Sequence, residues 1–375
     1  MRIRRSTATV LMVNLFGVLV ALGLIELVLR TIYTPPALQS RLLMNRLMRQ
    51  GPKQAEGLFD SARFHFEPNS TGQQLHNEYQ YSVRHDRFGW RNPCFNFEQP
   101  STAVLIGDSY TYGIGVSDND LLQCQLKQLD PNLNVYALGL PGANIEQYLA
   151  ILKYNSSTIR AVQPPQAKLD LVLCMGNDFE GLLAFAEPAT EATTVQATPA
   201  LKPSGWKAQL SAWNSQLMQQ PWIADLHLLQ LAKLAVLQNS RIKDHGDYFS
   251  NYGGQTFYKQ GVPDPVQPLS TALKRLQSEF KAAGFELGRV IMIPDGAEVS
   301  PERLRRDAQL GGFKPEAVDI QHKFRSLLKA CDQVGMRCVD LRPSVRGKDY
   351  YVFDGHFRPS GVAAVARSMV TELKQ

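Results

Sequence analysis

A serine, a histidine and an aspartate stand at positions where they could act as one chemical unit. Ser109 directly follows a short apolar run, and Gly107 gives the backbone freedom to make a sharp strand-to-helix turn there. Near the C-terminus, one residue separates Asp354 from His356. In an extended segment these two side chains would face the same way, so the carboxylate could orient the imidazole that takes the serine proton. The pattern predicts a nucleophile, a base and an orienting acid.

The ordinary explanations for the same residues differ in strength. Gly-Asp-Ser alone is compatible with a plain turn. Asp225 and His227 repeat the one-residue spacing, but they lie in a helical pattern, where side chains two apart point about 200° away from each other. We therefore expect a surface or packing role for that pair. The other histidines have no comparable acidic partner and are expected at the surface: His65, His76, His85, His245 and His322.

Two further loops supply candidate donors for an oxyanion. Gly142 follows the second predicted strand, and its backbone N–H can approach a ligand because no side chain intervenes. Asn177 follows the third, and its amide can point at the same place. Gly142 is also compatible with a helix start, and Asn177 with a simple turn. With the N–H of Ser109, these groups form the expected oxyanion hole.

Short apolar runs alternate with helical patterns from residue 101 onward. Helical patterns occupy residues 119–129 and 143–162. The runs have the length of strands and occur at residues 102–107, 133–138, 169–175, 287–293 and 336–341. Such alternation predicts an α/β fold with a parallel sheet covered by helices on both faces. In these sheets, functional groups gather at the carboxyl ends of the strands, where the candidate residues stand.

The net charge of +6 is unevenly distributed along the chain. Residues 1–53 hold eight basic residues against one acid, Glu26, whereas the remaining residues hold 32 basic and 33 acidic ones. A nucleic-acid-binding protein would carry its excess on the folded domain, so we expect no nucleic-acid partner. The basic arm instead suits anionic lipid headgroups.

An apolar run at residues 8–29 is long enough to cross a bilayer as a helix. The alternative is a cleaved signal peptide, but no small-residue cleavage site follows the run. Basic residues before it favour a cytoplasmic N-terminus, with the domain exported from a plasma or inner membrane into the periplasm. Arg41, Arg46 and Arg49 lie beyond the run and weaken that orientation. We expect the Glu26 side chain to extend to the membrane–water interface. The alternative is that it contacts a partner helix.

The chain divides into a small number of parts. We expect a membrane anchor at 1–33, a juxtamembrane linker at 34–57 and a catalytic domain at 58–375. Within that domain, residues 58–100 form an aromatic-rich extension of short extended pieces, and residues 179–285 contain an insertion. An insertion at this rim of a sheet commonly shapes the substrate opening.

Five cysteines are too few for a disulfide scaffold, and their spacing does not suit zinc. Cys174 lies in an apolar strand and is expected to be a buried thiol. Cys331 and Cys338 flank a predicted helix-to-strand turn, where they could pair in an oxidising compartment.

Residues 101–375 resemble the SGNH (GDSL-type) hydrolase superfamily. The resemblance rests, in family order, on Gly107-Asp108-Ser109, Gly142, Asn177-Asp178 and Asp354 with His356. It implies a three-layer α/β/α, flavodoxin-like fold without a metal or an organic cofactor. It assigns Ser109 as nucleophile, His356 as base and Asp354 as orienting acid. The oxyanion hole would comprise Ser109 N–H, Gly142 N–H and Asn177.

The sequence departs from the family pattern at two places. Gly176 directly precedes Asn177, where the family usually has Gly-x-Asn-Asp. One residue instead of two separates Asp354 from His356, a spacing that resembles membrane-anchored bacterial members related to polysaccharide O-acetylation. Residues 81–93 and 312–320 also look like segments of such members.

The resemblance implies a serine esterase that acts on O-acetyl groups of an extracytoplasmic glycan. Polysaccharide-assembly proteins would then be its partners. An O-acyltransferase would use the same acyl-enzyme and discharge it onto a sugar hydroxyl. A third alternative, from a different class, is a catalytically silent domain that binds glycan.

Overall fold

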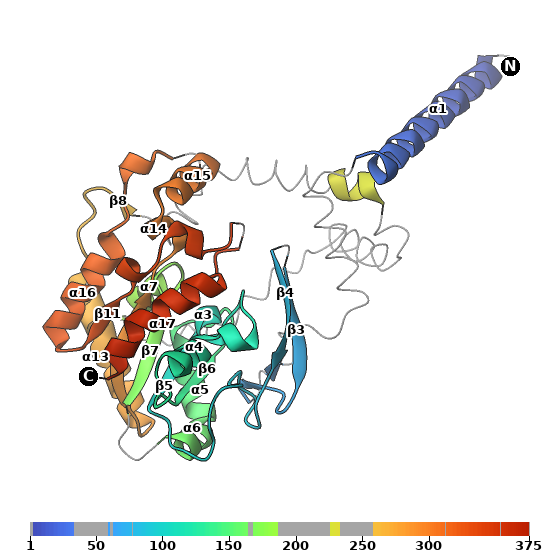
Figure 1. The fold of residues 1–375 in the computed structure, drawn as a ribbon. Helices are drawn as coiled ribbons and strands as arrows, with labels where there is room; N and C mark the ends of the chain where they lie inside the picture. The colour runs from blue at the N-terminus through green and yellow to red at the C-terminus, as the bar shows by residue number, and fades with distance from the viewer. Residues whose placement is uncertain are drawn as a thin grey trace. The chain divides into compact units, whose positions relative to one another are not determined.

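The computed structural model describes residues 3–33, 59–60, 63–76, 78–163, 168–186, 226–232, 258–311, 313–352 and 354–374. These residues belong to two compact units. One unit contains helix α1 (Ile3–Thr31) and residues 226–232, and the other contains the rest of the described chain (Figure 1). The predicted linker at 34–57 lies outside the described residues.

Helix α1 contains a candidate membrane span at Met12–Thr31, with a mean hydropathy of 2.4. Its apolar side chains are exposed, among them Leu15 and Phe16 at 60% and 69%. A core helix of a globular protein would bury such side chains, whereas a lipid-facing helix would not. The length and composition of this helix fit a membrane span, and they equally fit a signal sequence.

Glu26 contacts a second helical segment in the same unit. Its carboxylate accepts hydrogen bonds from the backbone N–H groups of His227 and Leu228, at 2.9 and 2.8 Å. It also accepts one from Arg30 at 2.6 Å. A carboxylate at the first N–H groups of a helix satisfies donors that have no partner within the helix. Glu26 therefore has the partner helix that the sequence offered as the alternative.

The larger unit is built on a five-stranded parallel sheet in the order β11-β9-β7-β5-β6. Its strands are β5 (Ala103–Gly107), β6 (Val135–Gly139), β7 (Lys168–Cys174), β9 (Glu286–Ile293) and β11 (Cys338–Asp340). All four neighbouring pairs are parallel. The α/β fold and each of the five predicted strands are therefore confirmed.

Helices cover both faces of this sheet (Figure 1). Successive strand residues alternate between two cores: Val104 and Ile106 belong to one, Ala103 and Leu105 to the other. The first core also contains residues of α5 (Ile145–Tyr154), α6 (Ser156–Val162), α7 (Asp178–Phe185), α13 (Val266–Ala282) and α16 (His322–Val334). The second contains residues of α4 (Leu122–Leu129) and α17 (Pro359–Leu373). This is a three-layer α/β/α arrangement.

Further short helices and strands accompany this framework. They are α3 (Ser109–Tyr112), α14 (Gly296–Val299), α15 (Pro301–Gly311) and the pair β8 (Tyr258–Lys259) with β10 (Val318–Asp319). The predicted insertion at 179–285 encloses α7 and α13, whose side chains are part of the sheet core. Residues 226–232, within the same range, belong to the unit that contains α1.

The N-terminal extension forms antiparallel pairs outside the main sheet. Strands β1 (Phe59–Asp60) and β2 (His65–Phe66) make one pair. Strands β3 (Thr71–His76) and β4 (Tyr79–Arg84) make a hairpin whose turn includes Glu78.

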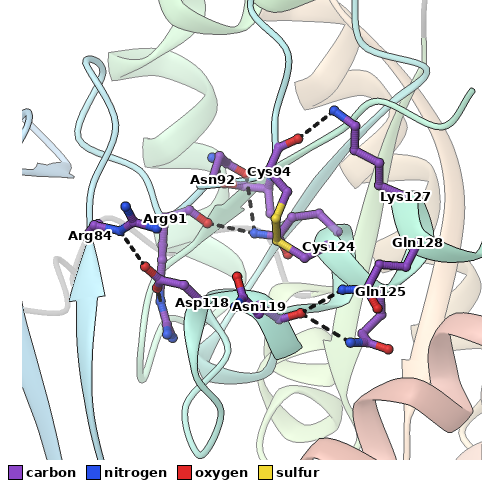
Figure 2. Close-up of a disulfide and its surroundings, with 12 residues drawn as sticks. Arg84, Arg91, Asn92, Cys94, Asp118, Asn119, Cys124, Gln125, Lys127 and Gln128 are labelled. Carbon is purple, nitrogen blue, oxygen red and sulfur yellow. Dashed lines mark hydrogen bonds and ion pairs between the residues drawn. A yellow bond between two sulfur atoms is a disulfide. The ribbon is translucent and has the colours of Figure 1, made fainter. Parts of the chain in front are cut away.

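Two disulfides are present, and one of them fixes the end of the extension. Figure 2 shows the Cys94–Cys124 bond, which joins the extension to α4. Beside it, Arg91 is buried and donates to the carbonyls of Gly113 and Val116, at 2.7 and 2.8 Å. The second bond joins Cys331 to Cys338, the pair that the sequence suggested. Cys174 is a buried free thiol, as predicted.

Candidate active site

Ser109 lies where β5 turns directly into α3. A Cβ atom at Gly107 would come within 2.2 Å of Thr111 Oγ1 and 2.8 Å of the Val172 carbonyl, so only glycine fits this turn. Asp108 caps α3 by accepting from the N–H of Tyr110 at 3.0 Å. The turn places Ser109 at the carboxyl end of the strand, half-buried and directed toward the C-terminal loop.

The structure brings Ser109, His356 and Asp354 into one hydrogen-bonded chain. His356 Nε2 lies 2.8 Å from Ser109 Oγ, and His356 Nδ1 lies 2.5 Å from Asp354 Oδ1. The two histidine nitrogens therefore face the hydroxyl and the carboxylate on opposite sides of the ring. In the neutral tautomer with the proton on Nδ1, Nε2 is free to accept the serine proton.

The local conformation around Asp354 differs from the one we expected. Residues 354–356 form a series of bends rather than an extended segment. The carboxylate reaches His356 Nδ1 because Asp354 also accepts the backbone N–H of His356, at 3.3 Å. The hydroxyl of Tyr110 holds the carbonyl of Gly355 from the other side, at 2.7 Å. The pairing predicted from the spacing is present, but alternation along a strand is not its cause.

Asp354 is held as a carboxylate. Its burial alone would raise the pKa, but the hydrogen bond and positive charge of His356 lower it, and the Tyr79 hydroxyl lowers it further. The pKa of Asp354 is consequently well below its usual range. An ionised Asp354 fixes the ring orientation of His356 and stabilises the imidazolium that forms when the ring takes a proton.

Two residues at the hairpin turn contact the loop that carries Asp354. Tyr79 Oη donates to Asp354 Oδ2, the oxygen that His356 Nδ1 does not use. Glu78 accepts the backbone N–H of Val352 at 2.8 Å and that of Asp354 at 2.9 Å, one on each carboxylate oxygen. Sequence reasoning missed both residues, since it assigned no role to the hairpin.

The three candidate oxyanion donors lie at neighbouring strand ends. The β6 end adjoins the β5 end, where Leu140 N donates to the Gly107 carbonyl, and Gly142 follows with φ +72°. Asn177 Nδ2 donates to Asp108 Oδ2 at 3.3 Å, which turns this exposed side chain toward the serine turn. Among the described residues, no hydrogen bond uses the N–H of Ser109 or Gly142. These donors are thus open to a ligand.

A buried carboxylate fixes the loop that carries Asn177. Asp178 Oδ2 accepts from Cys174 N and from Tyr148 Oη, both at 2.9 Å. Burial and the neighbouring charge of Asp108 raise the pKa of Asp178 well above its usual value. Asp178 is 1% exposed and therefore acts on the loop between β7 and α7 rather than on a ligand.

The prediction of surface positions is wrong for two histidines. His85 is 4% exposed, and its ring nitrogens lie 2.9 Å from Ser70 Oγ and 3.0 Å from Tyr112 Oη. His322 is fully buried and stacks on Tyr258. Both rings pack against aromatic side chains, which a histidine does readily when neutral. His245 and Asp225 are outside the described residues.

The known proteins that match this chain are solved structures of low sequence identity. No family model and no curated protein matches the chain. A solved structure of a member of the lipolytic protein G-D-S-L family from Veillonella parvula DSM 2008 is 11% identical, covers 73% of this chain and 98% of its own, and has a TM-score of 0.36. A carbohydrate acetylesterase family member from Sinorhizobium meliloti is 12% identical, with 72% and 97% covered and a TM-score of 0.36. Similarity at this level identifies neither a substrate nor an activity.

Proposed function

We propose that the chain is a serine-dependent acyl-ester hydrolase. The observation that carries this proposal is the continuous chain from Ser109 Oγ through His356 to Asp354, at 2.8 and 2.5 Å. A structural hydroxyl–imidazole–carboxylate chain is normally buried and closed to ligands. Here Ser109 and His356 are partly exposed, next to backbone donors that are open to a ligand.

The geometry supports a two-step reaction. Ser109 Oγ attacks the acyl carbon while His356 Nε2 takes the hydroxyl proton. The carbonyl oxygen becomes negative and is met by Ser109 N–H, Gly142 N–H and Asn177 Nδ2. His356 then gives its proton to the departing alkoxide as the ester C–O bond breaks. A water molecule attacks the acyl-enzyme, again deprotonated by His356, and the release of a carboxylic acid restores Ser109.

The experiment that tests the proposal is covalent labelling of the full chain, purified in a neutral detergent, with a serine-directed fluorophosphonate. We expect the label on Ser109, no label in Ser109→Ala, and slow labelling in His356→Ala. Labelling that persists in Ser109→Ala would place the reactive serine elsewhere. If the wild type were not labelled, the esterase function would be excluded and a glycan-binding domain would be favoured.

We further propose O-acetyl groups of an extracytoplasmic glycan as the natural ester. This part rests on the sequence resemblance to anchored SGNH proteins and is supported by chemistry of the chain. Disulfides persist in oxidising compartments, and two are present. Release of acetate from an acetylated oligosaccharide supports the hydrolase. Transfer of acetyl to a second saccharide without acetate release would identify the transferase.

The topology proposed is a single-pass anchor, with a cytoplasmic N-terminus and the site outside the cytoplasm. A phosphatase reporter fused after residue 375 should be active, and the mature protein should retain its basic N-terminus. A mature chain that starts near residue 35 would replace the anchor with a signal peptide.

A further inference from the structure

A strongly basic cavity lies beside the loop that carries Asp354 and His356. It has a volume of about 870 Å³, and its walls come from α15, from residues 346–352 and from Arg358. Six cationic side chains line it: Arg303, Arg305, Arg306, Arg346, Lys348 and Arg358. Glu302 is the one acidic residue among its lining residues.

Three of these arginines are aimed by backbone carbonyls of the loop. Arg358 donates to the carbonyl of Tyr350 at 2.9 Å. Arg303 donates to the carbonyl of Tyr351 at 2.8 Å, and Arg306 donates to the carbonyl of Val352 at 2.5 Å. A carbonyl oxygen orients a guanidinium group but carries no net charge to cancel its own. Arg303 and Arg358 thus keep their positive charge and keep other N–H donors for a ligand, whereas Arg306 also donates to the carboxylate of Asp307.

The acidic groups nearby compensate only part of this charge. Asp307 pairs with Arg306 at 2.9 Å. Asp349 is buried and accepts from Arg346 N and Ser360 Oγ. Among the described residues, Arg305 and Lys348 are exposed and have no ion pair or hydrogen bond from the side chain. Arg303 Nε is buried and has no hydrogen-bond partner there either.

The cavity is close to the triad through the loop itself. Tyr351 and Val352 line it, and Asp354 follows two residues later. A Cβ atom built on Gly355, between Asp354 and His356, would be 3.9 Å from Arg303 Nη2. The loop that carries the acid and the base of the triad is therefore also a wall of the cavity.

We propose that this cavity is a subsite for an anionic saccharide, so that the esters cleaved at Ser109 belong to an acidic glycan. Guanidinium groups match carboxylate, sulfate and phosphate oxygens in pairs, and several of them converge here. A concave site suits a charged sugar residue, whereas a membrane surface would need a flat or convex basic face. The proposal rests on the esterase function proposed above, because only then does a neighbouring subsite select a substrate.

The test uses the full chain in neutral detergent and the double variant Arg305→Glu with Lys348→Glu, which leaves the loop-bound arginines in place. The matched control is Lys274→Glu with Lys281→Glu, two exposed cations of α13 that do not line the cavity. Binding is measured by calorimetry with tetragalacturonate, a sulfated chondroitin tetrasaccharide, xylotetraose and glycerol phosphate. Turnover is measured with acetylated oligogalacturonate, acetylated xylo-oligosaccharide and p-nitrophenyl acetate.

The wild type and the control should bind an anionic tetrasaccharide and should prefer the acetylated anionic ester. The cavity variant should lose about 10- to 100-fold in that affinity and in kcat/KM for the anionic ester, since reversed charges repel the ligand. Its turnover of p-nitrophenyl acetate should be unchanged. Comparing tetragalacturonate with the sulfated chondroitin tetrasaccharide shows whether the cavity prefers carboxylate or sulfate groups.

The proposal would be overturned if xylotetraose bound as tightly as tetragalacturonate, or if the α13 control lost as much affinity as the cavity variant. It would also be overturned if glycerol phosphate bound more tightly than the anionic tetrasaccharides, which would indicate a lipid headgroup site. A loss on all three esters would make the cavity a structural support of the loop, which also overturns it. If no ester is cleaved and no fluorophosphonate label appears, the esterase function fails, while calorimetry still decides whether the cavity binds an acidic saccharide.

Discussion

Removal of the Tyr79 hydroxyl tests whether the hairpin belongs to the catalytic apparatus. In Tyr79→Phe the ring remains, and it still packs on the rings of Tyr81 and Tyr351, whose centroids lie 5.6 and 5.0 Å away. The lost group is a hydrogen-bond donor to Asp354 Oδ2. A hydrogen bond to a charged group contributes about 1.5–3 kcal/mol. Tyr79 also holds this carboxylate in line with His356 Nδ1, and if the whole contribution of that positioning is lost from the transition state, kcat/KM drops by about 10- to 150-fold.

The pH profile separates this role from a structural one. The Tyr79 hydroxyl lowers the pKa of Asp354, so its removal raises that pKa and makes the carboxylate more basic. A more basic carboxylate holds the imidazolium form of His356 more strongly. The acid limb of kcat/KM for p-nitrophenyl acetate should therefore move to higher pH, with KM and the thermal midpoint nearly unchanged.

Tyr81→Phe is the matched control on the same hairpin. Its hydroxyl contacts Gln74 and accepts the N–H of Gly115 at 2.5 Å, away from the triad. We expect Tyr81→Phe to lower the thermal midpoint and to leave the acid limb where it is. Full activity and an unmoved acid limb in Tyr79→Phe would refute the reasoning. An equal fall in thermal midpoint for both variants would reduce Tyr79 to a packing residue.

Three further predictions concern the site and its surroundings. Ser109→Ala and His356→Ala should each lower ester turnover by several powers of ten, with little further loss in the double variant; additive losses would show that the two do not act together. Asn177→Ala should lower kcat by about 100- to 1,000-fold and leave the thermal midpoint unchanged. Asp178→Ala should also lower the thermal midpoint, because it removes two buried hydrogen bonds. Wild-type turnover in Asn177→Ala would exclude its amide from the oxyanion hole. Burial lowers the pKa of His85 from 6.5 to about 4. The contribution of His85 to the free energy of unfolding is therefore complete above pH 6.5 and is lost as pH falls toward 4, at up to about 1.4 kcal/mol per pH unit. Urea titrations from about pH 4 to 8 should show this slope, and His85→Gln should remove it.

The sheet could be predicted from the sequence because its strands are buried on both faces. Parallel strands between two helical layers appear as continuous apolar runs, and Val104 to Ile106 or Leu171 to Leu173 are fully buried. The order of the strands could not be predicted. It depends on which apolar faces fit together after the crossovers form, and no local pattern records that choice.

The candidate site was partly predictable for a related reason. Parallel strands end at the same edge, so the residues after β5, β6 and β7 must lie near one another. Ser109, Gly142 and Asn177 could thus be grouped from the sequence alone. The contact of Tyr79 with Asp354 joins residues 275 positions apart, and neither position carries a local signal for it. A buried histidine such as His85 was also invisible, because exposure depends on what packs over the ring.

The segment from Tyr350 to Asp354 shows why the hairpin and the arginines must be considered together. Among its described residues, Tyr350 forms an isolated β-bridge with Phe357 and Tyr351 donates to the His356 carbonyl, and other parts of the chain satisfy further backbone groups. Arginines from α15 and Arg358 supply donors for its carbonyls, and Glu78 supplies acceptors for its N–H groups. A segment held through both kinds of backbone group cannot rotate without breaking charged hydrogen bonds. This rigidity is what a one-residue separation of Asp354 and His356 requires, since the carboxylate has no regular structure to aim it at the ring.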